Sequence, residues 1–210
     1  MVWILFWVVT FSLIDFLRKK GISHSEKWVW VAAVFLVFTF LAITYFRNVL
    51  PVVDISSLKA PLLTIVIVFL LTFLMYYLCR RFLKKPVKLI KNNPASYFIK
   101  MDYRYLLCKP FDILFQQVLI LVGVLWLTQR GLSLWGVIAY FIFLFGLLHF
   151  IWIKRAGKLF GRYFFISSLV GAIIFPILIL KVEGGFIYSY LAHFLFYTLS
   201  ALFFWVFARE

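Results

Sequence analysis

Seven stretches of this sequence are almost free of charge and long enough, or nearly so, to cross a lipid bilayer as helices. They cover residues 2–17, 28–46, 61–79, 111–128, 133–153, 163–180 and 185–207. A helix needs about 20 apolar residues to cross the hydrocarbon, with about 17–25 as the usual range. The 210 residues are 66% hydrophobic, far above the roughly 45–50% of a soluble domain. We therefore expect an all-α, multi-pass membrane bundle of about seven helices.

The positive charges lie between these stretches rather than along one soluble face. This pattern argues against a nucleic-acid partner, in spite of a formal net charge of +15. With the N-terminus outside, 18 of the 22 Lys and Arg fall on the cytoplasmic side, as the positive-inside rule requires. We expect a retained first helix with its N-terminus outside, a cytoplasmic C-terminus, and a place in the cytoplasmic membrane of a prokaryote.

The chain is expected to form a single membrane domain over residues 1–210. Residues 1–110 would supply N-terminal helices and a basic loop, and residues 111–207 the core. The loop, residues 80–110, mixes Lys and Arg with Phe, Tyr, Leu and Ile. This mixture suits a segment in the bilayer interface, with the lipid bilayer and anionic lipid headgroups as partners. A solvated basic loop that only fixes topology is the alternative.

Several polar residues occur inside the apolar stretches, where hydrocarbon would reject them. Such residues usually face protein or water and mark functional sites. Three pairs share a helix face because their members are four residues apart: Asp112 and Gln116, Phe145 and His149, His193 and Tyr197. We expect these faces, with Gln117, to converge in one intramembrane site. The plainer alternatives are glutamines that hydrogen-bond between helices, packed histidines, and an Asp112 that reaches water near its helix end.

The order and spacing of these residues resemble the CPBP family, the membrane proteases that include the CAAX prenyl endopeptidases and bacteriocin-processing proteins. That family carries Glu-Glu-x-x-x-Arg on one helix, Phe-x-x-x-His on the next, and His-x-x-x-Asn or a similar motif on a later one. Here Gln116-Gln117 stand in place of the glutamates and Leu121 in place of the arginine. The second motif is intact and ends at His149, and the third begins at His193. The resemblance covers about residues 111–200.

The resemblance implies an intramembrane endopeptidase, a CAAX-type hydrolase that acts on a membrane-associated peptide or lipidated protein. It gives catalytic positions to Gln116, Gln117, His149, His193 and Tyr197. A carboxamide cannot take a proton from water as a glutamate does, so Asp112 or a histidine would have to act as the base. Tyr197, in place of the family's Asn, could still donate a hydrogen bond to an oxyanion. The sequence thus leaves open whether the chain is an enzyme.

Two other functions fit the same residues. One is a catalytically impaired relative that binds a membrane peptide or a lipidated partner. The other is a small proton-coupled transporter, although the chain lacks the internal repeats that many transporters show. We expect no cofactor. A zinc ion held by Asp112, His149 and His193 is the alternative, but the sequence has no HExxH helix.

Overall fold

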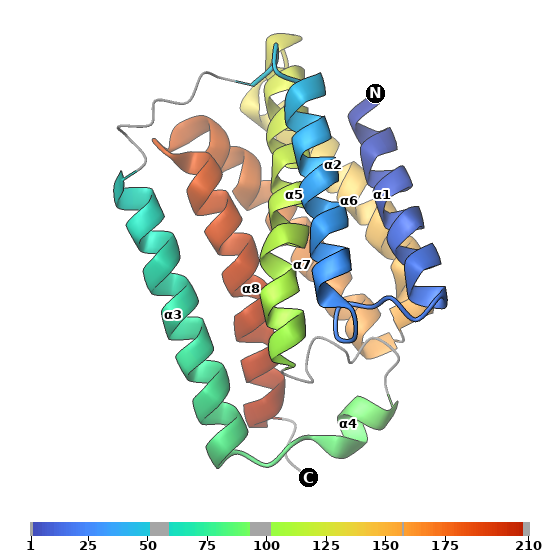
Figure 1. Cartoon of the computed structure of the whole chain (residues 1–210). Coiled ribbons are helices and arrows are strands. Elements are labelled where there is room, and N and C mark those ends of the chain that lie inside the picture. The colour runs from blue at the N-terminus through green and yellow to red at the C-terminus, as the bar shows by residue number, and fades with distance from the viewer. Residues whose placement is uncertain (1, 51–58, 93–101, 157, 208–210) are drawn as a thin grey trace. The chain divides into compact units, whose positions relative to one another are not determined.

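The regular secondary structure of this chain is helical wherever the structure describes it. The computed structural model describes residues 2–50, 59–92, 102–156 and 158–207 (Figure 1). Each predicted apolar stretch coincides with one of the long helices. In chain order the helices are α1 (Val2–Lys19), α2 (Trp28–Tyr45), α3 (Lys59–Phe82), α4 (Val87–Asn92), α5 (Tyr103–Gln129), α6 (Leu134–Ala156), α7 (Lys158–Lys181) and α8 (Gly185–Phe207).

Five of these helices are long and apolar enough to cross a membrane. They are α2, residues Leu63–Phe82 of α3, α5, α7 and α8, counted over the described residues. The apolar part of α6, Leu134–Phe150, is shorter, and α1 carries Asp15, Arg18 and Lys19 in its last turns. The predicted class, an all-helical integral membrane protein, is confirmed in this coarse form.

The N-terminal end of α5 differs from the prediction. A loop was expected up to residue 110, but α5 begins at Tyr103, so the prediction is wrong for residues 103–110. Asp102 caps this end, since its side chain accepts the backbone N–H of Arg104 at 2.9 Å, a standard way to satisfy a free N–H of the first turn. Pro110 lies inside the helix. Residues 93–101, the middle of the predicted interfacial loop, lie outside the described residues.

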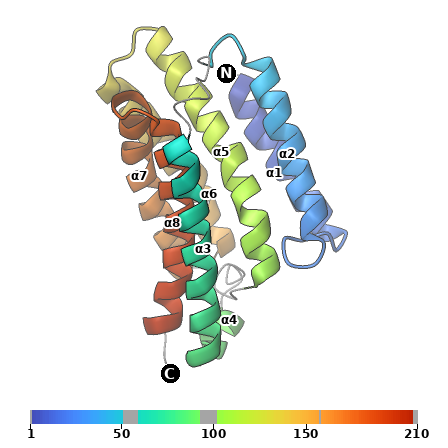
Figure 2. The same ribbon diagram turned by 60° about the vertical axis from the view of Figure 1, so that its left-hand side comes forward.

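The helices group into two compact units, and the first contains α1, α2 and α5. Aromatic contacts show how they pack. Phe6 lies beside Phe46 and Phe11 beside Phe35, so α1 and α2 are antiparallel neighbours. Phe115 of α5 lies 5.9 Å from Phe35, ring centre to ring centre, and both side chains are fully buried. Figure 2 shows α2 running along α5. This aromatic core fixes the N-terminal half of α5 against the α1–α2 hairpin.

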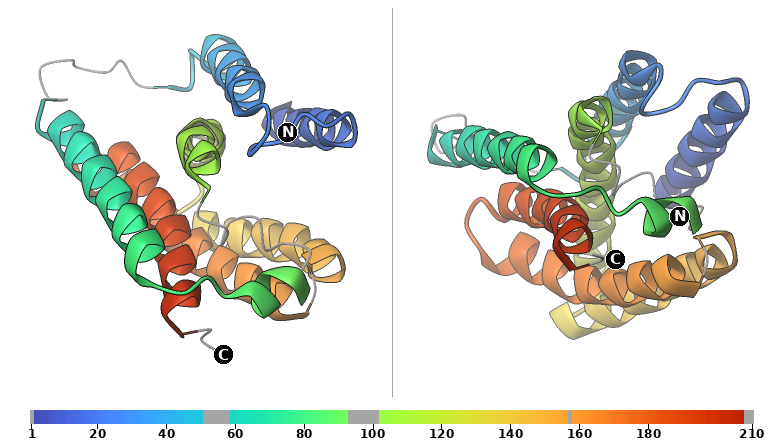
Figure 3. Two further views of the ribbon diagram at one scale, coloured as in Figure 1. Left: turned by 60° about the horizontal axis from the view of Figure 1, so that its bottom comes forward. Right: turned by 90° about the horizontal axis from the view of Figure 1, so that it is seen from below.

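The second unit contains α3, α4, α6, α7 and α8. Within it α6 packs along α7, while α8 packs against α7 and α3 (Figure 3). Phe69 of α3 and Phe194 of α8 have ring centres 4.4 Å apart. In the turn between α7 and α8, Gly184 adopts φ +66°, where glycine is favoured. Pro176 lies inside α7.

Candidate functional site

A stripe of polar side chains runs along one face of the N-terminal half of α5. Lys109, Asp112 and Gln116 follow one another at spacings of three and four residues, which places them on one side of the helix. All three are buried, and Asp112 is only 3% exposed. The ammonium of Lys109 lies 5.9 Å from the ring centre of Tyr105, one turn nearer the helix start. The next positions on this face are apolar, so the stripe ends at Gln116.

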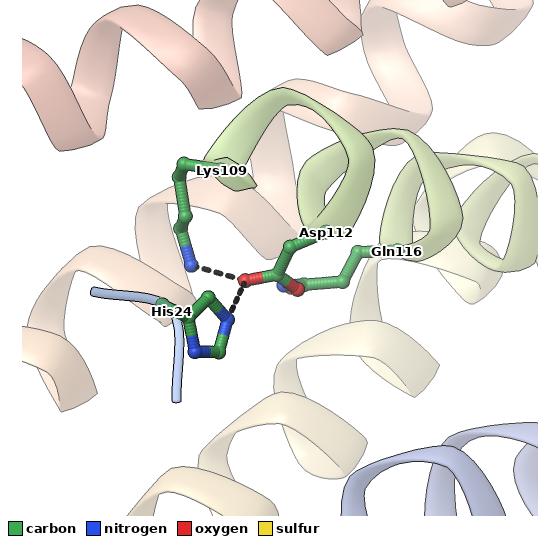
Figure 4. Close-up of polar contacts among 4 residues, drawn as sticks. All are labelled: His24, Lys109, Asp112 and Gln116. Atoms are coloured by element: carbon green, nitrogen blue, oxygen red, sulfur yellow. Dashed lines mark hydrogen bonds and ion pairs between the residues drawn. The ribbon is translucent and has the colours of Figure 1, made fainter. Parts of the chain in front are cut away.

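The carboxylate of Asp112 is the centre of this cluster. Its Oδ2 lies 2.5 Å from the Nζ of Lys109, and its Oδ1 accepts a hydrogen bond of 2.7 Å from the Nε2 of Gln116 (Figure 4). Each oxygen therefore has a donor from the same helix. Asp112 is the only buried carboxylate among the residues described. Because a buried charge is costly unless it is paired, Lys109 and Asp112 stabilise each other in this position.

A third residue joins the cluster from the loop between α1 and α2. The Nε2 of His24 lies 3.9 Å from the Oδ2 of Asp112 (Figure 4), beyond hydrogen-bond range but close enough for electrostatic interaction. The imidazole sits between the rings of Phe35 and Tyr105, at 6.0 and 5.7 Å. Burial lowers the pKa of His24 to about 4 and outweighs the attraction of Asp112. His24 is therefore neutral at pH 7.

Aromatic rings close the cluster on the side toward the middle of the helices. Phe11, Phe35 and Phe115 have ring centres within 5.9 to 6.4 Å of one another. These three rings come from α1, α2 and α5. Water entering from this side would have to pass a packed apolar layer.

The length of α5 gives the depth of the cluster in a membrane. At its C-terminal end Arg130 lies over Trp126, with 4.6 Å between the guanidinium carbon and the ring centre, and Trp and Arg are typical of the membrane interface. From Arg130, Gln116 lies about 21 Å and Asp112 about 27 Å along the axis, at 1.5 Å per residue. The hydrocarbon core is about 30 Å thick. With Arg130 at one boundary of the hydrocarbon and α5 upright, Asp112 would lie close to the opposite boundary and Gln116 about 9 Å inside it.

The other predicted site residues belong to the second unit. His149 of α6 makes a 2.9 Å hydrogen bond through Nδ1 to the carbonyl of Phe145. Since a carbonyl only accepts, Nδ1 is the donor, and a neutral ring keeps a lone pair on Nε2. The ring of His193 lies between those of Phe175 and Tyr197, with centres at 5.2 and 5.5 Å. Phe175 of α7 thus stacks with His193 and Tyr197 of α8.

The structure confirms that the two members of each predicted pair share a helix face. The convergence of the three faces in one site stays a prediction. Asp112 bonds to Gln116, His149 faces Phe145 at 6.4 Å between ring centres, and His193 stacks on Tyr197. Gln117 is fully buried on α5. Asp112, Gln116 and Gln117 lie in the first unit, and His149, His193 and Tyr197 lie in the second. One site shared by all six remains a prediction.

Two members of the cluster were not predicted from the sequence. Lys109 was counted with the basic loop, although it stands three residues before Asp112 and so shares its helix face. A Lys-x-x-Asp-x-x-x-Gln pattern at the start of an apolar helix was a readable signal for a buried ion pair. His24 lies in a polar loop far from α5 in sequence, and no local pattern marks it.

The described side chains do not form a metal site. Over residues 2–50, 59–92, 102–156 and 158–207, no three His, Cys, Asp or Glu side chains cluster in a way that could bind an ion. The cluster in the first unit supplies one carboxylate and one imidazole beside an ammonium. An adjacent ammonium repels a cation, so this arrangement is better suited to hydrogen bonding than to metal binding.

Comparison with models of protein families, with curated proteins and with solved structures finds no match. What the protein does must therefore be inferred from its own residues. The cluster around Asp112 brings a buried ion pair of α5 together with the neutral imidazole of His24 from the loop between α1 and α2. It offers donors, an acceptor and a neutral imidazole near the membrane boundary.

Proposed function

We propose that this chain is a membrane protein of the CPBP type that binds a membrane-associated peptide or a lipidated protein and does not cleave it. The observation that carries the proposal is the state of Asp112. Both of its oxygens are engaged, one by the ammonium of Lys109 and the other by the amide of Gln116. The carboxylate serves as the fixed centre of a polar network.

A peptidase of this type needs a group that takes a proton from water, which requires an available lone pair within hydrogen-bond reach. The positions that resemble the family's glutamates hold Gln116 and Gln117, and a carboxamide has no such basicity. Asp112 is the nearest carboxylate, but its oxygens already accept from Lys109 and Gln116. These oxygens keep lone pairs that can accept hydrogen bonds from a peptide, but the ammonium of Lys109 beside them opposes protonation of the carboxylate. The site therefore retains hydrogen-bonding groups for a peptide and lacks a strong carboxylate base.

We also propose that α1 and α6 complete a set of seven spans. The N-terminus would lie outside, and the loop that carries His24 would face the cytoplasm. This orientation is supported by the basic residues that flank that loop, among them Arg18, Lys19, Lys20 and Lys27. Single cysteines at Ser23 and at Glu183 should then be labelled from opposite sides of a sealed vesicle. Labelling of both from the same side would contradict seven spans.

Binding and cleavage can be separated in one experiment. Purified protein is incubated with a set of fluorescent peptides, with and without a prenyl group. Anisotropy measures binding, and mass spectrometry measures cleavage. We expect binding without cleavage by the natural chain and cleavage after the double substitution Gln116→Glu and Gln117→Glu. Gln129→Glu, the same chemical change at an exposed position of α5, is the matched control. Absence of binding to every peptide would overturn the proposal.

A second candidate, an active endopeptidase with Asp112 and His24 as its base, is favoured by one observation. The Nε2 of His24 lies 3.9 Å from Asp112 and the imidazole is neutral at pH 7, so a carboxylate and an imidazole stand together near the membrane boundary. The same assay tests it. Cleavage by the natural chain that disappears in both His24→Ala and Asp112→Asn would support this candidate against the binding protein.

A further inference from the structure

The loop between α1 and α2, residues 20–27, is built from two hydrogen-bonded turns. At its start, the backbone N–H groups of Gly21 and Ile22 donate to the carbonyls of Arg18 and Leu17 at 3.0 and 2.9 Å. Gly21 adopts φ +76°, the conformation in which many helices end at a glycine. A second turn follows, in which Lys27 donates to the carbonyl of Ser23 at 3.1 Å. Its tip is formed by His24 and Ser25.

This tip is held against α5 by contacts that are individually weak. The guanidinium of Arg104 donates to the carbonyl of Ser25 at 3.4 Å, which is long for a hydrogen bond. The neutral imidazole of His24 approaches Asp112 to 3.9 Å without a formal ion pair. The ring of Tyr105 adds an aromatic contact at 5.7 Å. The side chain of His24 remains 24% exposed, whereas that of Asp112 is 4% exposed.

We propose that residues 20–27 form a gate over the polar cluster of α5, closed by His24, and that a ligand reaches Asp112 and Gln116 only when this loop moves away. The proposal rests on the proposed function for what passes the gate, a peptide or lipidated protein. The gate itself is inferred from the contacts of His24 and Ser25 with α5. Residues 1–110 lie outside the stretch that resembles the CPBP family, so the gate is a feature of this chain's own N-terminal part.

The two sets of contacts have different strengths, and this difference makes a gate feasible. Lys109, Asp112 and Gln116 hold one another on a single helix through charged hydrogen bonds, which are the strong class. The loop is attached by a neutral imidazole, the contacts of that ring with Phe35 and Tyr105, and one exposed hydrogen bond. Loops with few strong contacts open at low free-energy cost while the core stays folded. The loop can therefore open without dismantling the cluster beneath it.

Thiol labelling tests the gate without any peptide. A reporter cysteine is introduced as Gln116→Cys in a chain that also carries Cys79→Ser and Cys108→Ser, and a small water-soluble maleimide is added to the purified protein. We expect His24→Ala to raise the labelling rate about tenfold, which corresponds to roughly 1.4 kcal/mol in the opening equilibrium. Arg104→Ala should raise it less, and the two substitutions together should raise it most.

Two controls separate gate opening from general unfolding. Ile120→Cys places the reporter one turn deeper on α5, where the natural side chain is 1% exposed, and should stay unlabelled with and without His24→Ala. Lys20→Ala changes an exposed residue of the same loop and should leave the rate unchanged. An equal rate in His24→Ala and its parent, or labelling of both reporters together, would overturn the gate. The labelling rates are measured without peptide. A failure to detect peptide binding would therefore contradict the proposed function but not the gate.

Discussion

The two units keep polar groups in apolar helices by different means. In the first unit Lys109, Asp112, Gln116 and His24 depend on one another, and the group spans a helix and a loop. In the second unit several polar side chains bond to their own helix backbone, although Tyr163 of α7 also hydrogen-bonds to Ser200 of α8. Examples are Ser167 to Tyr163, Ser168 to Phe165, Thr198 to Phe194, and His149 to Phe145.

This difference has consequences for function and for stability. A hydroxyl that hydrogen-bonds to the preceding turn of its own helix keeps that bond whatever the position of the helix. It therefore does not fix the helix against its neighbours, and its replacement should change the free energy of unfolding little. A charge that needs a partner from another position fixes that position as well. The cluster of the first unit therefore ties α5 to the loop between α1 and α2, whereas a hydroxyl bonded within its own helix leaves the position of that helix to close packing.

The largest expected effect tests the role of close packing in the second unit. A Cβ added at Gly185 would lie 1.9 Å from the carbonyl oxygen of Leu178, and a backbone atom of a neighbouring helix cannot move aside as a side chain can. We expect Gly185→Ala to lower the free energy of unfolding by more than about 5 kcal/mol and to give little monodisperse protein in size-exclusion chromatography.

The matched control is Gly131, which ends α5 in the first unit. It has φ +85° and nothing within 4 Å of an added Cβ, so Gly131→Ala carries backbone strain alone and should cost about 1 kcal/mol. Equal losses at the two glycines would show that the α7–α8 turn has room to relax.

The next effect is that of the buried ion pair. Lys109→Met leaves the carboxylate of Asp112 without its ammonium partner, and we expect a loss of about 3–5 kcal/mol, since one buried charge is then uncompensated. The double variant Lys109→Met with Asp112→Asn should recover most of this loss. Thermal unfolding in detergent measures the stability of the single and the double variant. Arg18→Met is the control, because Arg18 and Asp15 have the same three-residue spacing but are 61% and 37% exposed, and should lose less than about 1 kcal/mol.

A smaller effect is expected from the pH dependence of His24. Its pKa is about 4 in the folded protein, against an ordinary value of 6.5 that we take for the unfolded chain. Between these values the unfolded chain binds a proton that the folded chain refuses, so stability falls as the pH falls from 6.5 to 4 and changes no further below. We expect the protonation of His24 to lower the free energy of unfolding by about 1–3 kcal/mol over this range of pH. The loss in unfolding temperature between about pH 7 and about pH 4.5 should be smaller in His24→Gln, and equal losses would contradict the burial of His24.

The helices were largely predictable because membrane spans are recognised from composition over about 20 residues. The start of α5 was missed for a physical reason. Arg104 and Lys109 look like loop residues by charge, but Asp102 caps the helix and Asp112 neutralises Lys109. A pairing between charges three residues apart is visible in sequence only when the helix is already assumed to extend that far.

The site was predictable only where it is local. The pairing of Asp112 with Gln116 follows from helix periodicity, and so does the stacking of His193 on Tyr197. The contact of His24 with Asp112 depends on the packing of Phe35 against Phe115, which brings the α1–α2 loop to the start of α5. Contacts of this kind depend on the tertiary structure, and a single sequence carries no local signal for them.

The smallest expected effect examines the second unit's hydroxyls directly. Thr198 donates to the carbonyl of Phe194 in its own helix at 3.2 Å, so Thr198→Val keeps the shape and removes a bond that constrains no other element. We expect a loss below about 1 kcal/mol, read from thermal unfolding. Thr39 in α2 makes the same bond to Phe35 at 2.7 Å, and Thr39→Val should behave alike. A large loss at Thr198 alone would mean that this hydroxyl serves a partner beyond its helix, and the contrast between the units would then have to be abandoned.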